Sequence, residues 1–174
     1  MSKSNADRFS VLIIMGVSGC GKTTIAELLS RELGWEYRDG DEFHPTSNVE
    51  KMHSGTPLTD DDRWPWLKAI AAWIDDKRRT GRHAIVTCSA LKKIYRDILI
   101  GPRDDVALIY LKGDEELIAE RLSKRHGHFM PKGLLRSQFQ TLQEPGPDEH
   151  PVTVSIVPAP EEIAAAILRE LRGR

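Results

Sequence analysis

The stretch GVSGCGKT, residues 16–23, decides which fold this sequence is expected to adopt. It matches the pattern G-x-x-x-x-G-K-[ST] at every position. The apolar run FSVLIIM at 9–15 precedes it and is typical of a buried parallel strand. Apolar residues at helical spacing follow it, from Ile25 to Leu33. This order of strand, glycine-rich turn and helix predicts a loop that binds phosphate through backbone N–H groups and a helix N-terminus.

The phosphate loop also predicts specific contacts with a nucleotide. Lys22 can reach the β- and γ-phosphates, and the Thr23 hydroxyl can bind Mg²⁺. A partial dinucleotide-binding pattern, G-x-G-x-x-G, begins at Gly19, but Thr24 stands at its third glycine position, which disfavours a nicotinamide cofactor. The predicted nucleotide-binding residues of the loop are Gly16, Val17, Ser18, Gly19, Cys20, Gly21, Lys22, Thr23 and Thr24.

The rest of the chain alternates between strand and helix patterns. Further strands are expected at 35–38, 84–88, 106–111 and 152–157, and further helices at 46–54, 61–80, 90–100, 114–125, 134–142 and 161–172. Gly34 is expected as a helix C-cap and Pro65 within a first helical turn. The alternation predicts the α/β class, with a five-stranded parallel sheet covered by helices on both faces, the three-layer fold of P-loop kinases.

Composition and charge narrow the class of protein. The chain has 174 residues, 40% of them hydrophobic and 29% charged, which suits one domain at 9–174 behind a polar tail at 1–8. A net charge of −1 argues against a nucleic-acid binder, and no apolar run is long enough to span a membrane. The only two cysteines, Cys20 and Cys88, do not have the spacing of a metal site. With so few cysteines, we do not expect a framework of disulfide bonds. We therefore expect a cytoplasmic protein without nucleic-acid or membrane partners.

Two acids stand close together in RDGDEFHP, residues 38–45, just beyond the second predicted strand. Asp-Gly is common in turns, so a solvated turn is one interpretation. The other is functional, because two adjacent negative charges favour a nearby cation or a substrate proton. A phosphotransferase needs a carboxylate beside the acceptor hydroxyl and oxygen ligands for Mg²⁺. Our hypothesis is that Asp41 faces the acceptor hydroxyl and Asp39 the metal.

Five segments together resemble one enzyme family: GVSGCGKTT, DGDEFHP, KMHSGTPLTDDDRWPWL, CSALKKIYRD and RLSKRHGHFMPKGLLRSQFQTLQEP. They are similar to the gluconokinases of the small P-loop kinase type, relatives of shikimate kinase and the nucleoside monophosphate kinases. The resemblance covers nearly the whole chain beyond the first eight residues. It implies ATP-dependent phosphorylation of D-gluconate at O6 with Mg²⁺, a homodimer, and a lid at about 122–136 that closes over ATP.

The resemblance and the residue chemistry together give candidate roles. Catalysis is assigned to Lys22, Asp41 and Arg125, ATP contacts outside the loop to Arg121 and Arg125, substrate contacts to Asp41, His44, Arg63 and Lys92, and metal binding to Thr23 and Asp39. A guanidinium binds a carboxylate through two parallel hydrogen bonds, which suits Arg63 and gluconate. Pairing of Arg63 with neighbouring aspartates is the alternative. Lys92 and Arg96 are either substrate contacts or solvated helix charges.

Other functions remain open on the sequence alone. A P-loop kinase for another small acceptor, such as shikimate or a nucleoside monophosphate, shares most of these features. A nucleotide-dependent switch or binding module is a different class. The sequence lacks the N/T-K-x-D motif that reads guanine, which disfavours a GTPase switch. Dependence of ATP consumption on an acceptor separates a kinase from a switch.

Overall fold

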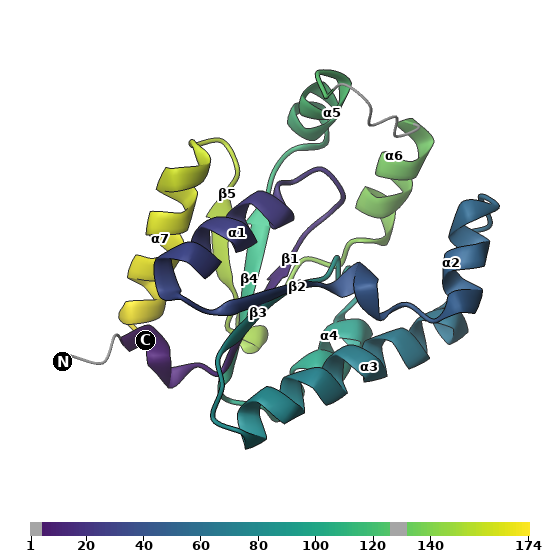
Figure 1. The fold of residues 1–174 in the computed structure, drawn as a ribbon. Helices are drawn as coiled ribbons and strands as arrows, with labels where there is room; N and C mark the ends of the chain where they lie inside the picture. Colours follow the sequence, from purple (N-terminus) through teal and green to yellow (C-terminus); the bar gives the residue numbers. More distant parts are fainter. Residues whose placement is uncertain (1–4, 126–131) are drawn as a thin grey trace.

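The computed structural model describes residues 5–125 and 132–174. Its sheet has five strands in the order β2-β3-β1-β4-β5, and all four pairings are parallel, as Figure 1 shows. The strands are β1 (Val11–Met15), β2 (Glu36–Asp39), β3 (Ala84–Thr87), β4 (Val106–Lys112) and β5 (Val152–Ser155). The predicted five-stranded parallel sheet is therefore confirmed.

Helices cover both faces of this sheet (Figure 1). One face carries α1 (Lys22–Leu33) and α7 (Pro160–Arg172), and the other carries α3 (Asp60–Arg79) and α4 (Lys93–Leu99). Successive side chains of a strand point to opposite faces. In β1, Leu12 and Ile14 accordingly pack in the core beneath α1 and α7. Val11, Ile13 and Met15 pack in the core beneath α3 and α4, which explains why this strand is apolar at every position.

The remaining helices lie around the end of the sheet that carries the phosphate loop. They are α2 (Thr46–His53), α5 (Glu115–Ser123) and α6 (Lys132–Thr141), together with the 3₁₀ turn η2 (Gly40–Phe43). Two further 3₁₀ turns, η1 (Asn5–Arg8) and η3 (Pro147–Glu149), come just before β1 and β5, at the opposite end of the sheet. Figure 1 shows α5 and α6 side by side at the top of the view. Within the described ranges, no helix is both long and apolar enough to cross a membrane.

Two predicted segments fall partly outside the described residues. The predicted lid at about 122–136 includes the end of α5 and the start of α6, while residues 126–131, with His126 and His128, lie outside the description. Of the predicted tail, residues 5–8 form η1 and Ala6 is buried, and residues 1–4 lie outside the description. The division into a tail, one domain and a lid stays a prediction.

Two helices differ from their predicted boundaries for local reasons. The helix expected from residue 90 begins at Lys93, because Ala90 has φ 45° in the left-handed region and interrupts the helical path. Helix α3 begins at Asp60, behind a capping box formed by Thr59 and Asp62. Pro65 therefore lies in the second turn rather than the first, where it leaves the Asp61 carbonyl without its usual helical donor.

Candidate active site

The phosphate loop connects β1 to α1 and has the backbone shape that its glycines predict. Gly16, Gly19 and Gly21 all have φ between 82° and 152°, a region that other residues rarely adopt. The Nζ of Lys22 donates to the carbonyl oxygens of Gly16 and Val17, at 2.9 and 3.0 Å. These bonds hold the ammonium over the loop, where it faces any anion bound by the loop amides.

The acid pair lies at the carboxyl end of β2, the neighbour of β3. Asp39 accepts the backbone N–H of Asp41 at 2.9 Å and so caps the short turn η2. A Cβ on Gly40 would lie 2.2 Å from the Thr87 carbonyl oxygen, so only glycine allows this close approach to β3. The indole N–H of Trp66 donates to the Gly40 carbonyl at 2.7 Å and ties the turn to α3. The Asp-Gly turn is therefore anchored on both sides.

The phosphate loop and the acid turn open into one cavity of about 390 Å³. We call this the acceptor cavity. Its lining contains most of the predicted catalytic, substrate and metal residues. Its lining includes Ser18, Lys22, Thr23, Asp39, Asp41, His44, Arg63, Arg125 and Gln138. The structure thus brings together residues that are more than 100 positions apart in the sequence.

The pKa of Asp41 is raised above the ordinary value for an aspartate. The walls of the cavity partly desolvate its carboxyl group and raise its pKa, and repulsion from Asp39 raises it further, while Lys22 opposes both effects. The side chain itself remains 83% exposed to the cavity. A carboxylate with a raised pKa and an open approach can accept a proton from a bound hydroxyl group.

Arg63 is oriented by hydrogen bonds to the loop before α3 and to α4, and by a long ion pair with Asp60. Its Nη1 donates to the Leu58 carbonyl at 2.9 Å and to the Tyr95 hydroxyl at 3.3 Å, and it lies 4.0 Å from Asp60. The Tyr95 hydroxyl donates in turn to Asp60. This network presents a guanidinium to the acceptor cavity in a fixed orientation, as bidentate binding of a carboxylate requires.

A second cavity of about 390 Å³ adjoins the first on the far side of the phosphate loop. Thr24, Arg121 and Arg125 line it, together with residues 156–159 of the loop between β5 and α7 and the first residue of α7. Arg125 and three loop residues line both cavities, so the two cavities lie next to each other on either side of the phosphate loop. The predicted ATP contacts at Thr24, Arg121 and Arg125 thus meet in one place.

Comparisons with known proteins agree with this geometry. A family model described as an AAA domain matches residues 11–145. The gluconokinase of Gluconobacter oxydans (strain 621H) is 44% identical over 162 residues, covering 93% of this chain and 91% of that protein. The thermoresistant gluconokinase of Escherichia coli (strain K12) is 46% identical, covering 93% and 92%. The chain belongs to the gluconokinase family.

A solved structure supports the same assignment at the level of the fold. The crystal structure of a gluconokinase from Sinorhizobium meliloti 1021 superposes with a TM-score of 0.85, at 40% identity over 93% of this chain and 91% of the other. The P-loop kinase fold predicted from the sequence is therefore confirmed, and with it the resemblance to gluconokinases on which the candidate roles were based.

Three basic residues lie outside the lining of the acceptor cavity. Lys92, a predicted substrate contact, is not in the lining of the acceptor cavity and instead binds Asp60 at 3.1 Å. Arg96 is 1% exposed and holds Glu149 at 2.7 and 3.1 Å, so it is neither a solvated charge nor part of the lining of the acceptor cavity. Arg136 is exposed and lies 3.5 Å from Glu115 of α5.

The residues of the phosphate loop in this gluconokinase-family protein differ in the exposure of their side chains. Val17 and Cys20 have buried side chains, and burial raises the pKa of the Cys20 thiol. Only their backbone groups are in a position to contact phosphate.

Gln138 of α6 lines the acceptor cavity and forms hydrogen bonds with Ser18 of the loop, a contact that the sequence did not predict. A glutamine within a helix pattern gives no signal of such a long-range contact.

Two oxygen donors of the acceptor cavity are the candidate metal ligands. Among residues 5–125 and 132–174, no three His, Cys, Asp or Glu side chains cluster as a metal site. Thr23 and Asp39 nevertheless supply a hydroxyl and a carboxylate to the acceptor cavity. Mg²⁺ prefers oxygen ligands and is often held by one or two carboxylates together with substrate phosphates. The donor set therefore fits a Mg²⁺ ion that arrives with a nucleotide.

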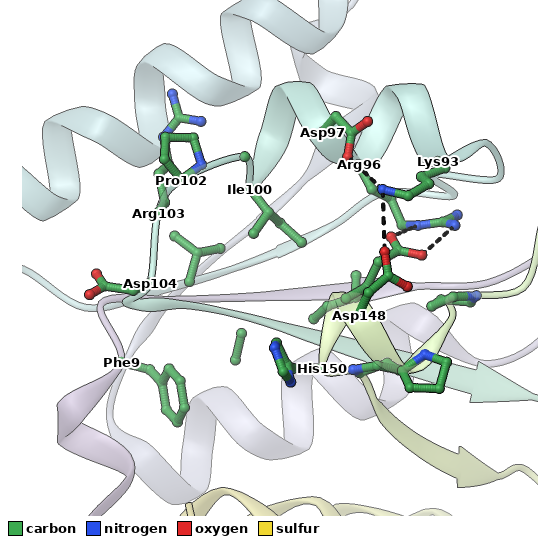
Figure 2. A pocket seen from close by; sticks show the side chains of 18 of the residues that line it. Phe9, Lys93, Arg96, Asp97, Ile100, Pro102, Arg103, Asp104, Asp148 and His150 are labelled. Carbon is green, nitrogen blue, oxygen red and sulfur yellow. Dashed lines mark hydrogen bonds and ion pairs between the residues drawn. The ribbon is translucent and has the colours of Figure 1, made fainter.

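A cavity of about 1120 Å³ is larger but lies far from this chemistry. Figure 2 shows it near the first residues of β4, with Lys93, Asp97 and Asp148 among its labelled side chains. Three of its charges lie close together: Lys93 is 3.3 Å from Asp97 and 3.7 Å from Asp148. Ligands of open parallel sheets bind at the carboxyl ends of the strands, so the smaller acceptor cavity is the candidate active site.

Proposed function

We propose that this protein transfers the γ-phosphoryl group of ATP to the 6-hydroxyl of D-gluconate. The single observation that carries the proposal is the acceptor cavity, in which Lys22, Asp41 and Arg63 face one space. Each suits one part of the reaction: a phosphate, a hydroxyl proton and a substrate carboxylate. Identity of 44–46% to gluconokinases favours gluconate over other acceptors.

The transfer can be described by the bonds that change. The 6-oxygen of gluconate forms a bond to the γ-phosphorus as the bond from that phosphorus to the bridging oxygen of ADP breaks. The proton of the hydroxyl group passes to the Asp41 carboxylate. Lys22 and Arg125 stabilise the charge on the phosphoryl oxygens. Arg63 binds the gluconate carboxylate and so holds the far end of the acceptor in place.

Mg²⁺ is proposed as the metal of the reaction, held by Thr23 and Asp39 beside the phosphates. When bound, it would neutralise phosphate charge and orient the γ-phosphoryl group. The segment at 122–136 is proposed as a lid that brings Arg125 onto the nucleotide and excludes water. We also propose that the protein acts as a homodimer, which light scattering on a gel-filtration column would measure.

The proposed function is tested by coupled detection of ADP. The protein is incubated with Mg-ATP and, separately, with gluconate, shikimate, glycerate, AMP or no acceptor. Rapid ADP release with gluconate alone is expected. ADP release with another acceptor would support the kinase chemistry but disprove gluconate as the substrate. A rate of ADP release that no acceptor changes would instead indicate a nucleotide-dependent binding module.

A further inference from the structure

His44 forms part of the wall of the acceptor cavity, and its ring is firmly held there. The imidazole stacks on Trp66 with ring centroids 4.2 Å apart and an angle of 15° between the planes. Its side chain is only 4% exposed. The ring orientation is therefore set by packing, and the edge that carries Nε2 lies toward Asp41.

A buried asparagine determines which ring nitrogen carries the proton. Asn48 of α2 is 2% exposed, and its Nδ2 lies 2.8 Å from the Asp62 carbonyl oxygen. A carbonyl oxygen can only accept, so the side-chain atom that faces it must be the amide nitrogen. The same nitrogen lies 3.2 Å from Nδ1 of His44 and can donate its second hydrogen there. Nδ1 must accept that bond, which leaves the proton of a neutral ring on Nε2.

The surroundings also keep the ring neutral. Burial lowers the pKa of His44, and the positive charge of Arg63 lowers it further, while the negative charge of Asp39 has the opposite effect. A neutral ring has one N–H, and the bond from Asn48 directs that N–H toward the acceptor cavity.

We propose that Asn48 fixes His44 as the Nε2–H tautomer, and that this N–H orients the Asp41 carboxylate toward the acceptor hydroxyl. The inference rests on the proposed function of the acceptor cavity. His44 Nε2 lies 3.9 Å from Asp41 Oδ1, longer than a hydrogen bond. Asp41 is exposed enough to rotate, and catalytic hydrogen bonds often shorten only when substrate binds.

The opposite tautomer would work against the reaction. It would place the Nε2 lone pair against the negative charge of Asp41 and push the carboxylate away. His44 and Asn48 are positioning residues in this account, because the acceptor proton goes to Asp41 and His44 keeps its own. The bond from Asn48 thus determines whether Asp41 is held or repelled.

The first test is independent of any activity. Two-bond proton–nitrogen NMR correlation on ¹⁵N-histidine-labelled protein at pH 7 reports the tautomer of each ring, and a His44→Gln spectrum assigns the signals of His44. We expect Nε2 to have the shift of a protonated nitrogen and Nδ1 that of an unprotonated one. The reverse pattern, or a ring protonated on both nitrogens, would overturn the proposal. Asn48→Ala should convert the single tautomer into a mixture.

The second test compares two substitutions of nearly equal shape. His44→Gln keeps an N–H donor, whereas His44→Met does not. Because a hydrogen bond to a charged group contributes about 1.5–3 kcal/mol, we expect kcat to fall about 10- to 100-fold in His44→Met and less than about 5-fold in His44→Gln. KM for ATP should change in neither. Equal losses of kcat in the two variants would contradict the role of the donor.

The two tests separate failure of this inference from failure of the proposed function. A protein that ignores gluconate but shows the Nε2–H tautomer would disprove the function and leave the tautomer in place. A protein that phosphorylates gluconate but carries its proton on Nδ1 would confirm the function and disprove the tautomer.

Discussion

Gln138 of α6 and Ser18 of the phosphate loop form two hydrogen bonds across 120 positions of sequence. The Gln138 side-chain oxygen accepts the Ser18 backbone N–H at 2.7 Å, and its amide nitrogen donates to the Ser18 hydroxyl at 2.8 Å. Because α6 begins directly after residues 126–131, this pair joins the helix behind the predicted lid to the loop that binds phosphate.

Gln138→Ala should therefore weaken catalysis through the loop. Two neutral hydrogen bonds of about 0.5–1.5 kcal/mol each correspond to a loss of about 5- to 100-fold in kcat/KM for ATP. Steady-state kinetics at saturating acceptor measure it. Gln140→Ala is the matched control, because Gln140 is exposed on the same helix and should leave the kinetics unchanged. Equal kinetics of the two variants would show that the bond pair has no role.

Asp41→Asn should nearly abolish turnover, because the amide cannot accept the acceptor proton. General-base catalysis contributes about 10²- to 10⁴-fold, and kcat should fall by that range. ATP affinity, measured by calorimetry, should stay close to that of the unsubstituted protein. Since the pKa of Asp41 is raised, the acidic limb of the kcat/KM profile for gluconate should lie above pH 3.8, the ordinary value for an aspartate. A variant with normal turnover would remove Asp41 from its assigned role.

The same substitution should make the fold more stable at neutral pH. The folded protein holds the Asp41 proton more tightly than the unfolded chain, so stability falls as pH rises from below 3.8 through the raised folded pKa. At pH 7, Asp41→Asn should therefore unfold at a higher temperature than the unsubstituted protein, and the gain should disappear below that window. Calorimetric scans across pH measure the difference.

Asp62→Asn is a control for which we expect the opposite change in unfolding temperature at pH 7. Bonds from Lys51 and the Thr59 backbone N–H hold the pKa of Asp62 at about 2. Its contribution to stability is present above pH 3.8 and is lost as pH falls through 2. This variant should unfold at a lower temperature at pH 7 and converge with the parent at low pH. The same sign for both substitutions would contradict the pKa directions.

Arg63→Lys should impair acceptor binding more than it impairs nucleotide binding. A lysine cannot form the two parallel bonds that a guanidinium makes with a carboxylate, and loss of one charged bond corresponds to about 10- to 100-fold in KM for gluconate. Arg79→Lys is the control, because Arg79 is 75% exposed at the far end of α3. An unchanged KM in Arg63→Lys would assign the gluconate carboxylate to another residue.

Arg96→Leu should lower the stability of the fold and leave KM for gluconate unchanged. Removing one partner of a buried ion pair leaves Glu149 unpaired and costs about 3–5 kcal/mol of unfolding free energy. Denaturant titration measures this loss. If the folded fraction of the variant showed a raised KM for gluconate with normal stability, Arg96 would be a substrate residue instead.

Local sequence predicted the parts of the site that depend on neighbouring residues. The phosphate loop and the acid turn at Asp39 to Asp41 each rest on contacts within a few positions. Their residue types therefore report the geometry directly. The order and type of the strands and helices followed for the same reason, since periodicity reports which side of an element is buried.

The remaining parts depend on contacts between distant segments. Gln138, Asn48 and Tyr95 each act through a partner on another element, and nothing in their own neighbourhood distinguishes them from ordinary helix residues. Arg96 looks like a solvated helix charge until η3 brings Glu149 against it. Pairings of this kind become visible only when the chain is folded.

Phosphorus NMR of the reaction with Mg-ATP and gluconate tests the central claim most directly, because it shows where the phosphoryl group goes. We predict one new phosphate monoester, coupled to the two protons on carbon 6 of gluconate and formed in step with ADP, and its formation about 10²- to 10⁴-fold more slowly with Asp41→Asn. Formation of inorganic phosphate with ADP, or of a monoester at another carbon, would contradict it.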